Sequence, residues 1–386
     1  MLDEALLDSP DALARADTGG LLPSVAAAGA RVRTAARAAA EAGLGELKPD
    51  GRPRTLLIAG PGSAPGQLAD LLGGLAACPV LPLAPTGSAP TAQELRWTLP
   101  GWAGPLDLLL LTTADGTEPG LTGLVEQAYR RGCTVAGVSP SGTPLTGALQ
   151  QAHGLALPFA PPPYRPTATE AYDAAHGTEP DVPPDPGAFW ALLTPLLSLA
   201  DRMGLLSAPP DVVAAVADRL DAAAERFGPA AETYRNPAKA LAVELAHSLP
   251  LVWSEGATVA PAARRFAAVL TSLAGRPALA AALPEAIAEH RALLDGTLTP
   301  AGDDLDDFFR DRVEEPDGLR LRIVLLREPE TEPATAAVEA ANAHGTPLSE
   351  IDAADGSPAE TLAELLALTD FAAVYLALTP AEGSSA

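Results

Sequence analysis

The amino-acid sequence predicts an α/β fold built from two doubly wound halves, each a parallel sheet between layers of helices. Two observations carry this prediction. Short apolar runs typical of buried strands alternate with helical segments in the first part of the chain. A second series of strand and helix patterns follows a proline-rich break, so two similar halves are expected. We predict an N-terminal subdomain over residues 1–187 and a C-terminal subdomain over residues 188–386.

Apolar runs of strand length mark the first half. They cover residues 55–60, 79–85, 106–113 and 133–139. An Ala/Arg-rich pattern with helical spacing precedes them at 22–43, and helices are expected within 61–76 and 117–132. Residues 158–187 are rich in Pro, Asp and Tyr without any period, which is typical of an interdomain linker or a loop over a pocket.

Helical patterns return in the second half. They cover residues 189–206, 210–228, 236–249, 264–275, 334–345 and 357–378. Strands are predicted at 249–254 and 319–328, the short segment 347–352 lies between the last two helices, and the apolar segment 276–285 is ambiguous. Asn236 followed by Pro237 predicts a helix start.

Composition excludes several classes of function. The 386 residues include 49 acidic and 25 basic side chains, and the net charge of −24 repels nucleic acid and anionic lipid. Cys78 and Cys133 have no spacing that could hold a metal, so we expect neither metal nor cofactor. The N-terminus lacks the pattern of a signal peptide, and no apolar stretch reaches about 18 residues, so a cytoplasmic protein is expected.

Two loops that follow predicted strands are candidates for holding an anion. Residues 59–66 (AGPGSAPG) and 112–120 (TTADGTEPG) are rich in glycine and hydroxyl side chains. Thr117 could cap the following helix, which would leave backbone N–H groups pointing at a phosphate. The alternative is that both are ordinary turns. Asp115 and Glu118 are expected to repel an anion at this place.

At these residues the chain resembles the SIS (sugar isomerase) family, and within it the bifunctional phosphoglucose/phosphomannose isomerases. Residues 59–66 are similar to that subfamily's GMGGSAIG loop, and 112–118 to its SYSGNTEET loop. Residues 265–290 match the subfamily's RW–LPE–NHNE segment without a gap, and 366–377 resemble its LxxGDYxSxYLA segment. The positions that coincide in the ungapped segment are Arg265, Leu270, Ala274, Pro277, Ala278, Leu283, Pro284 and Glu285. The resemblance implies two SIS-type subdomains.

The resemblance also implies which catalytic groups are missing. Aldose–ketose isomerisation needs a base, acid/base groups for ring opening and a cation near the enediolate. The family's base falls on Ser272 and its His on Ala288, its linker Arg falls near Gly187, and its C-terminal Lys has no counterpart. Ser63, Thr112 and Thr117 keep hydroxyls on the phosphate side, whereas Ala114 replaces a Ser. We therefore expect a phosphosugar-binding protein whose isomerase activity is lost or much reduced.

Two other functions stay open. The chain could be an active isomerase that converts glucose 6-phosphate and mannose 6-phosphate to fructose 6-phosphate with relocated acid/base residues, for which Glu285 and His290 are the tentative candidates and Glu289 lies beside them. It could also be an oligomer scaffold with an empty cleft. The resemblance implies a hexose 6-phosphate or a related phosphosugar as the ligand and a homodimer as the assembly, with no role for nucleic acid or membrane.

Overall fold

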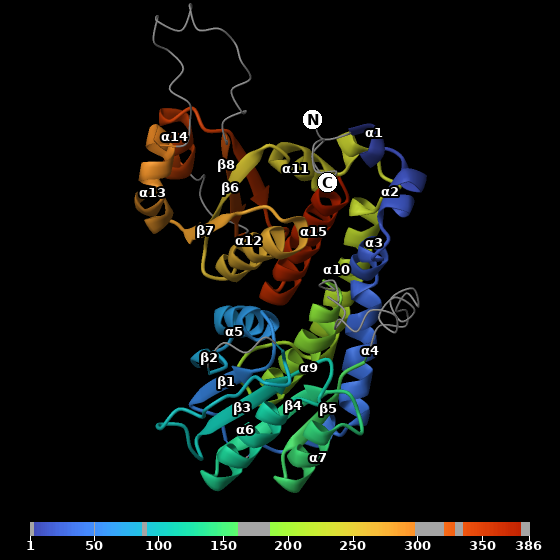
Figure 1. Cartoon of the computed structure of the whole chain (residues 1–386), viewed down its shortest axis with the longest axis vertical. Helices are drawn as coiled ribbons and strands as arrows, with labels where there is room; N and C mark the ends of the chain where they lie inside the picture. Colours follow the sequence, from blue (N-terminus) through green and yellow to red (C-terminus); the bar gives the residue numbers. More distant parts are fainter. Residues whose placement is uncertain are drawn as a thin grey trace, which may run out of the picture. The chain divides into compact units, whose positions relative to one another are not determined.

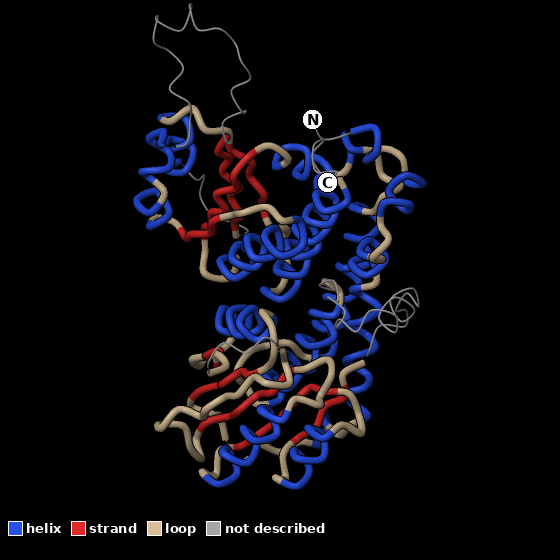
Figure 2. Tube along the Cα trace, viewed as in Figure 1, coloured by secondary structure: helices blue, strands red, loops and turns tan. Residues whose placement is uncertain are grey.

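Two compact units make up the chain, and each contains one sheet (Figure 2). The computed structural model describes residues 4–49, 51–86, 91–160, 186–297, 320–328 and 335–379. The first unit comprises Met1–Thr18, Glu225–Asp355 and Glu364–Ala386, and the second comprises Gly19–Ala224 and Gly356–Ala363. The predicted division between residues 187 and 188 stays a prediction.

The second unit is built on a five-stranded sheet of order β2-β1-β3-β4-β5 (Figure 1). Its strands are β1 (Thr55–Ala59), β2 (Val80–Leu83), β3 (Asp107–Thr112), β4 (Thr134–Ser139) and β5 (Leu155–Pro158). Every pair is parallel. The central strands β1 and β3 are buried throughout, because neighbouring strands pair with both edges and helices cover both faces.

Figure 1 shows helices on both sides of this sheet. On one face, α6 (Pro119–Arg130) and α7 (Pro144–Gln151) form a core with alternate residues of the strands and with Trp97. On the other side, α5 (Ala64–Leu75), α4 (Ala28–Glu41) and α9 (Ala188–Arg202) pack together. The remaining helices up to α10 among the described residues are α1 (Glu4–Leu7), α2 (Pro10–Ala16), α3 (Leu21–Ala26), the 3₁₀ turn η1 (Leu44–Glu46) and α10 (Pro210–Phe227).

The first unit contains a four-stranded parallel sheet of order β7-β6-β8-β9. Its strands are β6 (Ser248–Glu255), β7 (Leu279–Ala282), β8 (Arg320–Arg327) and β9 (Leu348–Asp352). The helices that follow α10 are η2 (Thr233–Arg235), α11 (Pro237–Leu245), α12 (Ala260–Ala274), α13 (Glu285–Glu289), the π-helical turn η3 (Leu293–Thr297), α14 (Thr335–Ala343) and α15 (Pro358–Leu378). The α/β prediction with two parallel sheets is confirmed.

Most predicted elements are present, with three differences. The pattern at 22–43 is broken at Ala27 into α3 and α4. Strand β5 was not predicted, and it ends at Pro158, where the linker was expected to begin. The ambiguous segment 276–285 contains strand β7. Asn236 is the N-cap of α11 and accepts from the N–H groups of Ala238 and Lys239, as expected. Residues 161–185 of the predicted linker lie outside the described residues.

Among the described residues, α15 alone is long and apolar enough to cross a membrane by length and composition. However, 89% of its apolar 18-residue window is buried inside the protein. Such burial is typical of a core helix, so the hydropathy of α15 reflects packing within the fold.

Candidate functional site

The carboxyl edge of the five-stranded sheet carries the three predicted phosphate-binding residues. Ala59 pairs with Leu111 across the parallel strands β1 and β3, so the two strands end side by side. The loop after β1 contains Ser63, and the loop after β3 begins beyond Thr112 and contains Thr117. In open parallel sheets, ligands bind at this edge, where loops lead into helix N-termini. We call this edge, residues 60–66 and 112–118, the candidate site.

The turn between β1 and α5 depends on Gly60. A Cβ atom at Gly60 would lie 2.1 Å from the Thr112 carbonyl oxygen and 2.9 Å from the Thr112 hydroxyl. Glycine therefore lets the two loops touch. Ser63 follows at the N-cap of α5, exposed and without a side-chain cap hydrogen bond. Within the described part of the chain, its Oγ accepts from the Gln67 Nε2 at 3.5 Å and makes no other hydrogen bond, so the first turn of α5 remains open to an anion.

Thr112 is buried at the end of β3, with 2% of its surface exposed. Its Oγ1 has no hydrogen-bond partner among the described residues. A buried hydroxyl that lacks a partner is costly unless water or a ligand satisfies it. Thr112 therefore lies in the candidate site with an unused polar atom directed at the Gly60 turn.

Two buried side chains fix the shape of the loop after β3. The Thr113 hydroxyl donates to Glu118 Oε1 at 2.5 Å and accepts from the backbone N–H groups of Asp115 and Gly116. Glu118 is 1% exposed and is the N-cap residue of α6, and its side chain makes no capping hydrogen bond to the first turn. The prediction that Thr117 caps this helix is therefore wrong, because the N-cap position falls on the next residue.

Thr117 uses its hydroxyl within the loop. It donates to Asp115 Oδ2 at 2.6 Å and accepts from Gln93 Nε2 at 2.7 Å. Gln93 also lies 3.5 Å from the same Asp115 oxygen. The three side chains are exposed, and their hydrogen bonds join them into a polar rim on the loop after β3. Asp115, which was expected to oppose an anion, is part of that rim.

A third loop at the same edge was missed by the sequence reasoning. It follows β4 and contains Thr143, which caps α7 by accepting from the Thr146 N–H. A Cβ atom at Gly116 would lie 2.6 Å from the Thr143 hydroxyl, so this loop touches the one after β3. Ser139 and Thr146 hydroxyls are hydrogen-bonded to each other, and Thr146 also bonds Thr143. The glycine- and hydroxyl-rich run 139–143 directly after a predicted strand was the available signal.

The positions that correspond to the family's base and His lie in the first unit, whereas Gly187, near the position of its linker Arg, lies in the second unit. Ser272 is exposed on α12, and Ala288 is exposed on α13. Glu285 is exposed at the first position of α13 and has no hydrogen-bond or ion-pair partner within the described part of the chain. The phosphate-side residues Ser63, Thr112 and Thr117 belong to the second unit.

His290 is buried, with 6% of its surface exposed. Its Nδ1 accepts from the indole N–H of Trp253 at 2.8 Å, and the two rings stack. Burial lowers the pKa of His290, while Glu289 opposes that change. An imidazole that accepts at Nδ1 and is neutral carries its proton on Nε2. His290 thus lies in the core between the sheet and α13, whereas Glu285 faces solvent.

Two positions from the family resemblance form a buried ion pair in the first unit. Arg265 on α12 bonds Asp370 on α15, and both side chains are nearly inaccessible to solvent. Burial raises the pKa of Asp370, and the guanidinium of Arg265 lowers it. Because this pair has no exposed face, we interpret it as structural.

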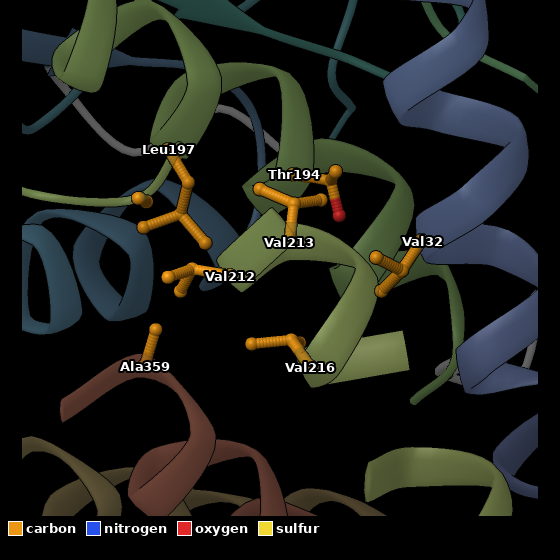
Figure 3. Close-up of a pocket in the computed structure, with 8 residues that line it drawn as sticks. Val32, Thr194, Leu197, Val212, Val213, Val216 and Ala359 are labelled. Carbon is orange, nitrogen blue, oxygen red and sulfur yellow. The ribbon is translucent and has the colours of Figure 1, made fainter. Parts of the chain in front are cut away.

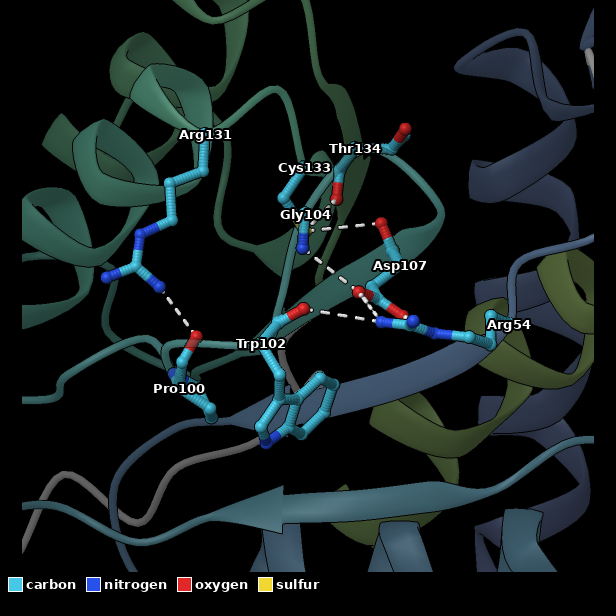
Figure 4. A network of polar contacts seen from close by, with 8 residues as sticks. All are labelled: Arg54, Pro100, Trp102, Gly104, Asp107, Arg131, Cys133 and Thr134. Carbon is cyan, nitrogen blue, oxygen red and sulfur yellow. Dashed lines mark hydrogen bonds and ion pairs between the residues drawn. The ribbon is translucent and has the colours of Figure 1, made fainter.

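A network of polar contacts at the amino edge of the five-stranded sheet also has a structural role (Figure 4). Asp107 at the start of β3 accepts from Arg54 through both carboxylate oxygens and from the Gly104 N–H. Cys133 Sγ donates to the Asp107 carbonyl. Burial, with help from the Asp107 charge, raises the pKa of Cys133 to about 11, so its thiol is unreactive at neutral pH.

Figure 3 shows a small apolar cavity in the second unit. Its volume is about 10 Å³, and its lining residues are Val32, Thr194, Leu197, Ala208, Val212, Val213, Val216 and Ala359. The Thr194 hydroxyl bonds the Trp190 carbonyl and offers nothing to a ligand. A space this small holds at most one water, so the cavity is a packing gap. Among the described residues, no three His, Cys, Asp or Glu side chains gather to hold a metal.

Comparison with known proteins agrees with this architecture. Residues 234–380 match the family of the bacterial phospho-glucose isomerase C-terminal SIS domain. No protein among those with curated functions matches the chain. Similar solved structures include a hypothetical protein from Thermus thermophilus, with 14% identity and a TM-score of 0.56 over 97% of this chain and 91% of that one.

Two further structures are similar over most of their length. A protein classed as a phosphosugar isomerase from Clostridium difficile has 12% identity and a TM-score of 0.55, covering 92% of each chain. The C-terminal domain of glucosamine-fructose-6-phosphate aminotransferase from Francisella tularensis has 14% identity and a TM-score of 0.50, covering 92% of this chain and 96% of that one. At sequence identities this low, the similarity shows a shared fold and nothing beyond it.

Two parallel sheets flanked by helices, with hydroxyl-rich loops at a carboxyl edge, define an α/β protein with the fold of these structures. Within that fold, residues 234–380 are the segment of this chain that is similar to the bacterial phospho-glucose isomerase C-terminal SIS domain.

Proposed function

We propose that this protein binds a phosphosugar at the candidate site and has lost most or all isomerase activity. The observation that carries the proposal is the contrast between the two sets of positions. Ser63 and Thr112 present hydroxyls beside the open first turn of α5. Ser272 and Ala288, where an isomerase of this type would carry its base and its His, have no group that can transfer a proton at neutral pH.

The phosphate would lie at the N-terminus of α5. The backbone N–H groups of Ala64 and Gly66 in the first turn lack helical partners, Pro65 has no N–H, and the partial positive charge of the helix end favours an anion. Ser63 Oγ would donate to the phosphate, and Thr112 Oγ1 would gain the partner that it lacks. The first turn of α6 is less suitable, because its N-cap residue is the acidic Glu118, whose carboxylate would repel a phosphate.

The relocated-base alternative requires Glu285 and His290 to act together. His290 gives its Nδ1 lone pair to Trp253 and is buried, and Glu285 is on the exposed side of α13. Proton transfer needs both groups within reach of the same substrate carbons. This arrangement favours the binding protein over the working isomerase.

A coupled assay with glucose 6-phosphate and mannose 6-phosphate tests the loss of activity. Removing a general base typically costs 10²–10⁴-fold, so we expect turnover at least about 100-fold below that of a bacterial phosphoglucose isomerase that retains both groups. Normal turnover that E285A or H290A abolishes would establish the working isomerase instead.

Calorimetric titration with glucose 6-phosphate tests binding. We expect S63A to weaken binding about fivefold to tenfold through loss of one hydrogen bond to a charged group. The matched control is T134A, which removes an exposed hydroxyl at the opposite end of the same sheet and should leave the affinity unchanged. Equal affinities of wild type and S63A would place the phosphate elsewhere. The predicted homodimer and cytoplasmic location are further parts of this proposal, which light scattering and fractionation can test.

A further inference from the structure

We propose that the Glu328 carboxylate is a built-in anion that closes one turn of the first unit to phosphate. The turn between β6 and α12 has the same construction as the β1–α5 turn, where the proposed function puts the phosphate. In the second unit this turn is open, whereas in the first unit a carboxylate of the chain itself fills it. The inference rests on the proposed function only for the position of the phosphate.

The two turns match residue by residue. Each follows an inner strand of its sheet and begins with a glycine directly after the strand, Gly60 after β1 and Gly256 after β6. The sequences are GPGSAP over 60–65 and GATVAP over 256–261, so the helix N-cap is the fourth residue and Ala-Pro follows it in both. The N-cap backbone angles also agree, with φ −86° and ψ −18° at Ser63 and φ −89° and ψ −16° at Val259.

The residue that faces the glycine differs between the two turns. The register of β1 with β3 puts Thr112 opposite Gly60, and a Cβ atom on that glycine would lie 2.9 Å from the threonine hydroxyl. The register of β6 with β8 puts Glu328 in the same place opposite Gly256, where a Cβ atom would lie 2.6 Å from the glutamate Oε1. Glu328 therefore has the position of Thr112 and brings a negative charge to it.

The Glu328 carboxylate occupies the turn as an external anion would. Its Oε1 accepts from the Thr258 N–H at 2.5 Å, one residue before the N-cap of α12. Its Cδ would lie 2.2 Å from a Cβ atom at Gly256, so the carboxylate lies directly against the backbone of the turn. A hydrogen bond from a backbone N–H to a charged acceptor and the positive end of the helix dipole both favour this arrangement. A phosphate at the same turn would have to displace the carboxylate against its charge.

The neighbouring charges also disfavour a second anion. Residues 255–259, 327–328 and 352–355 contain one cation, Arg327. Its guanidinium bonds Glu255 at 2.8 Å and Asp352 at 3.3 Å, so two carboxylates of the chain already neutralise it. At the corresponding edge of the second unit, the buried Thr112 Oγ1 has no partner among the described residues. A polar atom that needs a partner is thus present in the turn that Glu328 does not close.

Hydrogen exchange of the full chain, read by mass spectrometry with and without inorganic phosphate, tests the proposal. In the wild type, phosphate should slow exchange in peptides that cover residues 60–66 and leave those that cover 256–263 unchanged. E328T gives the first unit the residue of position 112, and saturating phosphate should then slow exchange at 256–263 at least about fivefold. E328A also removes the carboxylate and should show the same gain more weakly.

The control variant is E339T, which removes an exposed carboxylate from α14 of the same unit and should respond as the wild type does. Sodium chloride at equal ionic strength corrects for screening. Thermal melting establishes which variants are folded, and the wild-type measurement depends on no variant.

The possible results separate the two proposals. Phosphate protection of 256–263 in the wild type, or none in folded E328T and E328A, would overturn the role of Glu328, and a response at 60–66 would then still support the proposed function. A wild type without any response at 60–66 would overturn the proposed function. In that case a gain at 256–263 in E328T would still establish Glu328 as the group that closes this turn.

Discussion

Single residues show how this chain combines an exposed edge for a ligand with an interior in which buried polar groups must find hydrogen-bond partners. Lys239 is completely buried, and its ammonium donates to the carbonyls of Leu7, Pro229 and Ala231 at 2.6–2.9 Å. Leu7 is the last residue of α1, so one side chain fastens the N-terminal helix to the loop before α11 within the first unit. The lysine therefore satisfies backbone groups, and chemistry at this ammonium is not expected.

K239M should lower the free energy of unfolding by about 2–4 kcal/mol, because three carbonyls lose their donor. Denaturant unfolding monitored by circular dichroism measures this loss. Lys48, the only other lysine, is exposed, and K48M serves as the control with an expected change below about 0.5 kcal/mol. A K239M variant as stable as K48M would mean that water replaces the ammonium.

His290 predicts a pH dependence of stability. Burial lowers its pKa in the folded chain, so below the ordinary value of 6.5 the unfolded chain binds more protons than the folded one. Stability conferred by the neutral imidazole is thus present above pH 6.5 and is lost as the pH falls, at no more than about 1.4 kcal/mol per pH unit. H290Q keeps an acceptor for Trp253 and should remove this part of the dependence.

Urea unfolding between pH 8 and pH 5 measures the difference between wild type and H290Q. The exposed His247 supplies the control, since H247Q should follow the wild-type curve. If wild type and H290Q lose stability in parallel as the pH falls, protonation of His290 does not cause the loss of stability. That result would also reopen a role for this side chain in proton transfer.

At the scale of elements, the sequence predicted what depends on local pattern. Strands β1 and β3 are continuous apolar runs, and both are present close to their predicted bounds. Strands β5 and β7 have four residues each, contain Pro or Ala and lie at sheet edges. No alternation of apolar and polar residues identifies them as strands. Their strand conformation depends on pairing with a neighbouring strand, which the local sequence does not reveal.

The sequence likewise predicted only part of the candidate site. The hydroxyl-bearing loops were found from their position after strands, and Ser63, Thr112 and Thr117 lie at one edge. What the hydroxyls bond could not be predicted, because the partner of Thr117 is Gln93, 24 residues earlier. The burial of His290 against Trp253, 37 residues earlier, was equally invisible in the sequence.

The β1–α5 turn gives a prediction about two glycines of one element. A methyl group at Gly60 would lie 2.1 Å from the Thr112 carbonyl oxygen, so G60A should displace the turn. We expect G60A to lower the free energy of unfolding by about 2 kcal/mol or more and to weaken sugar phosphate binding at least tenfold. Gly73, farther along α5, would meet only the Val80 Cβ at 3.8 Å, which is an ordinary van der Waals contact. G73A should therefore leave binding unchanged and raise stability by up to about 1 kcal/mol. Titration and denaturant unfolding of both variants check this; similar affinities would place the ligand away from the turn.

At the scale of the whole molecule, each unit has its own sheet and its own buried polar contacts. In the first unit, α12 and α15 are joined by Arg265 and Asp370, which are far apart in the sequence. In the second unit, Arg54 and Asp107 fasten β1 to β3. Such separate sets of long-range contacts allow the two units to lose structure independently.

R265M tests that independence. It leaves the Asp370 carboxyl buried without its cation, which should cost about 3–5 kcal/mol, while R265M/D370L should recover most of the loss because no charge remains. Hydrogen exchange read by mass spectrometry should show lost protection in β6 and β8 and unchanged protection in β1 and β3. Equal loss in both sheets would mean that the chain unfolds as one cooperative body, and the predicted two-subdomain organisation would then describe topology alone.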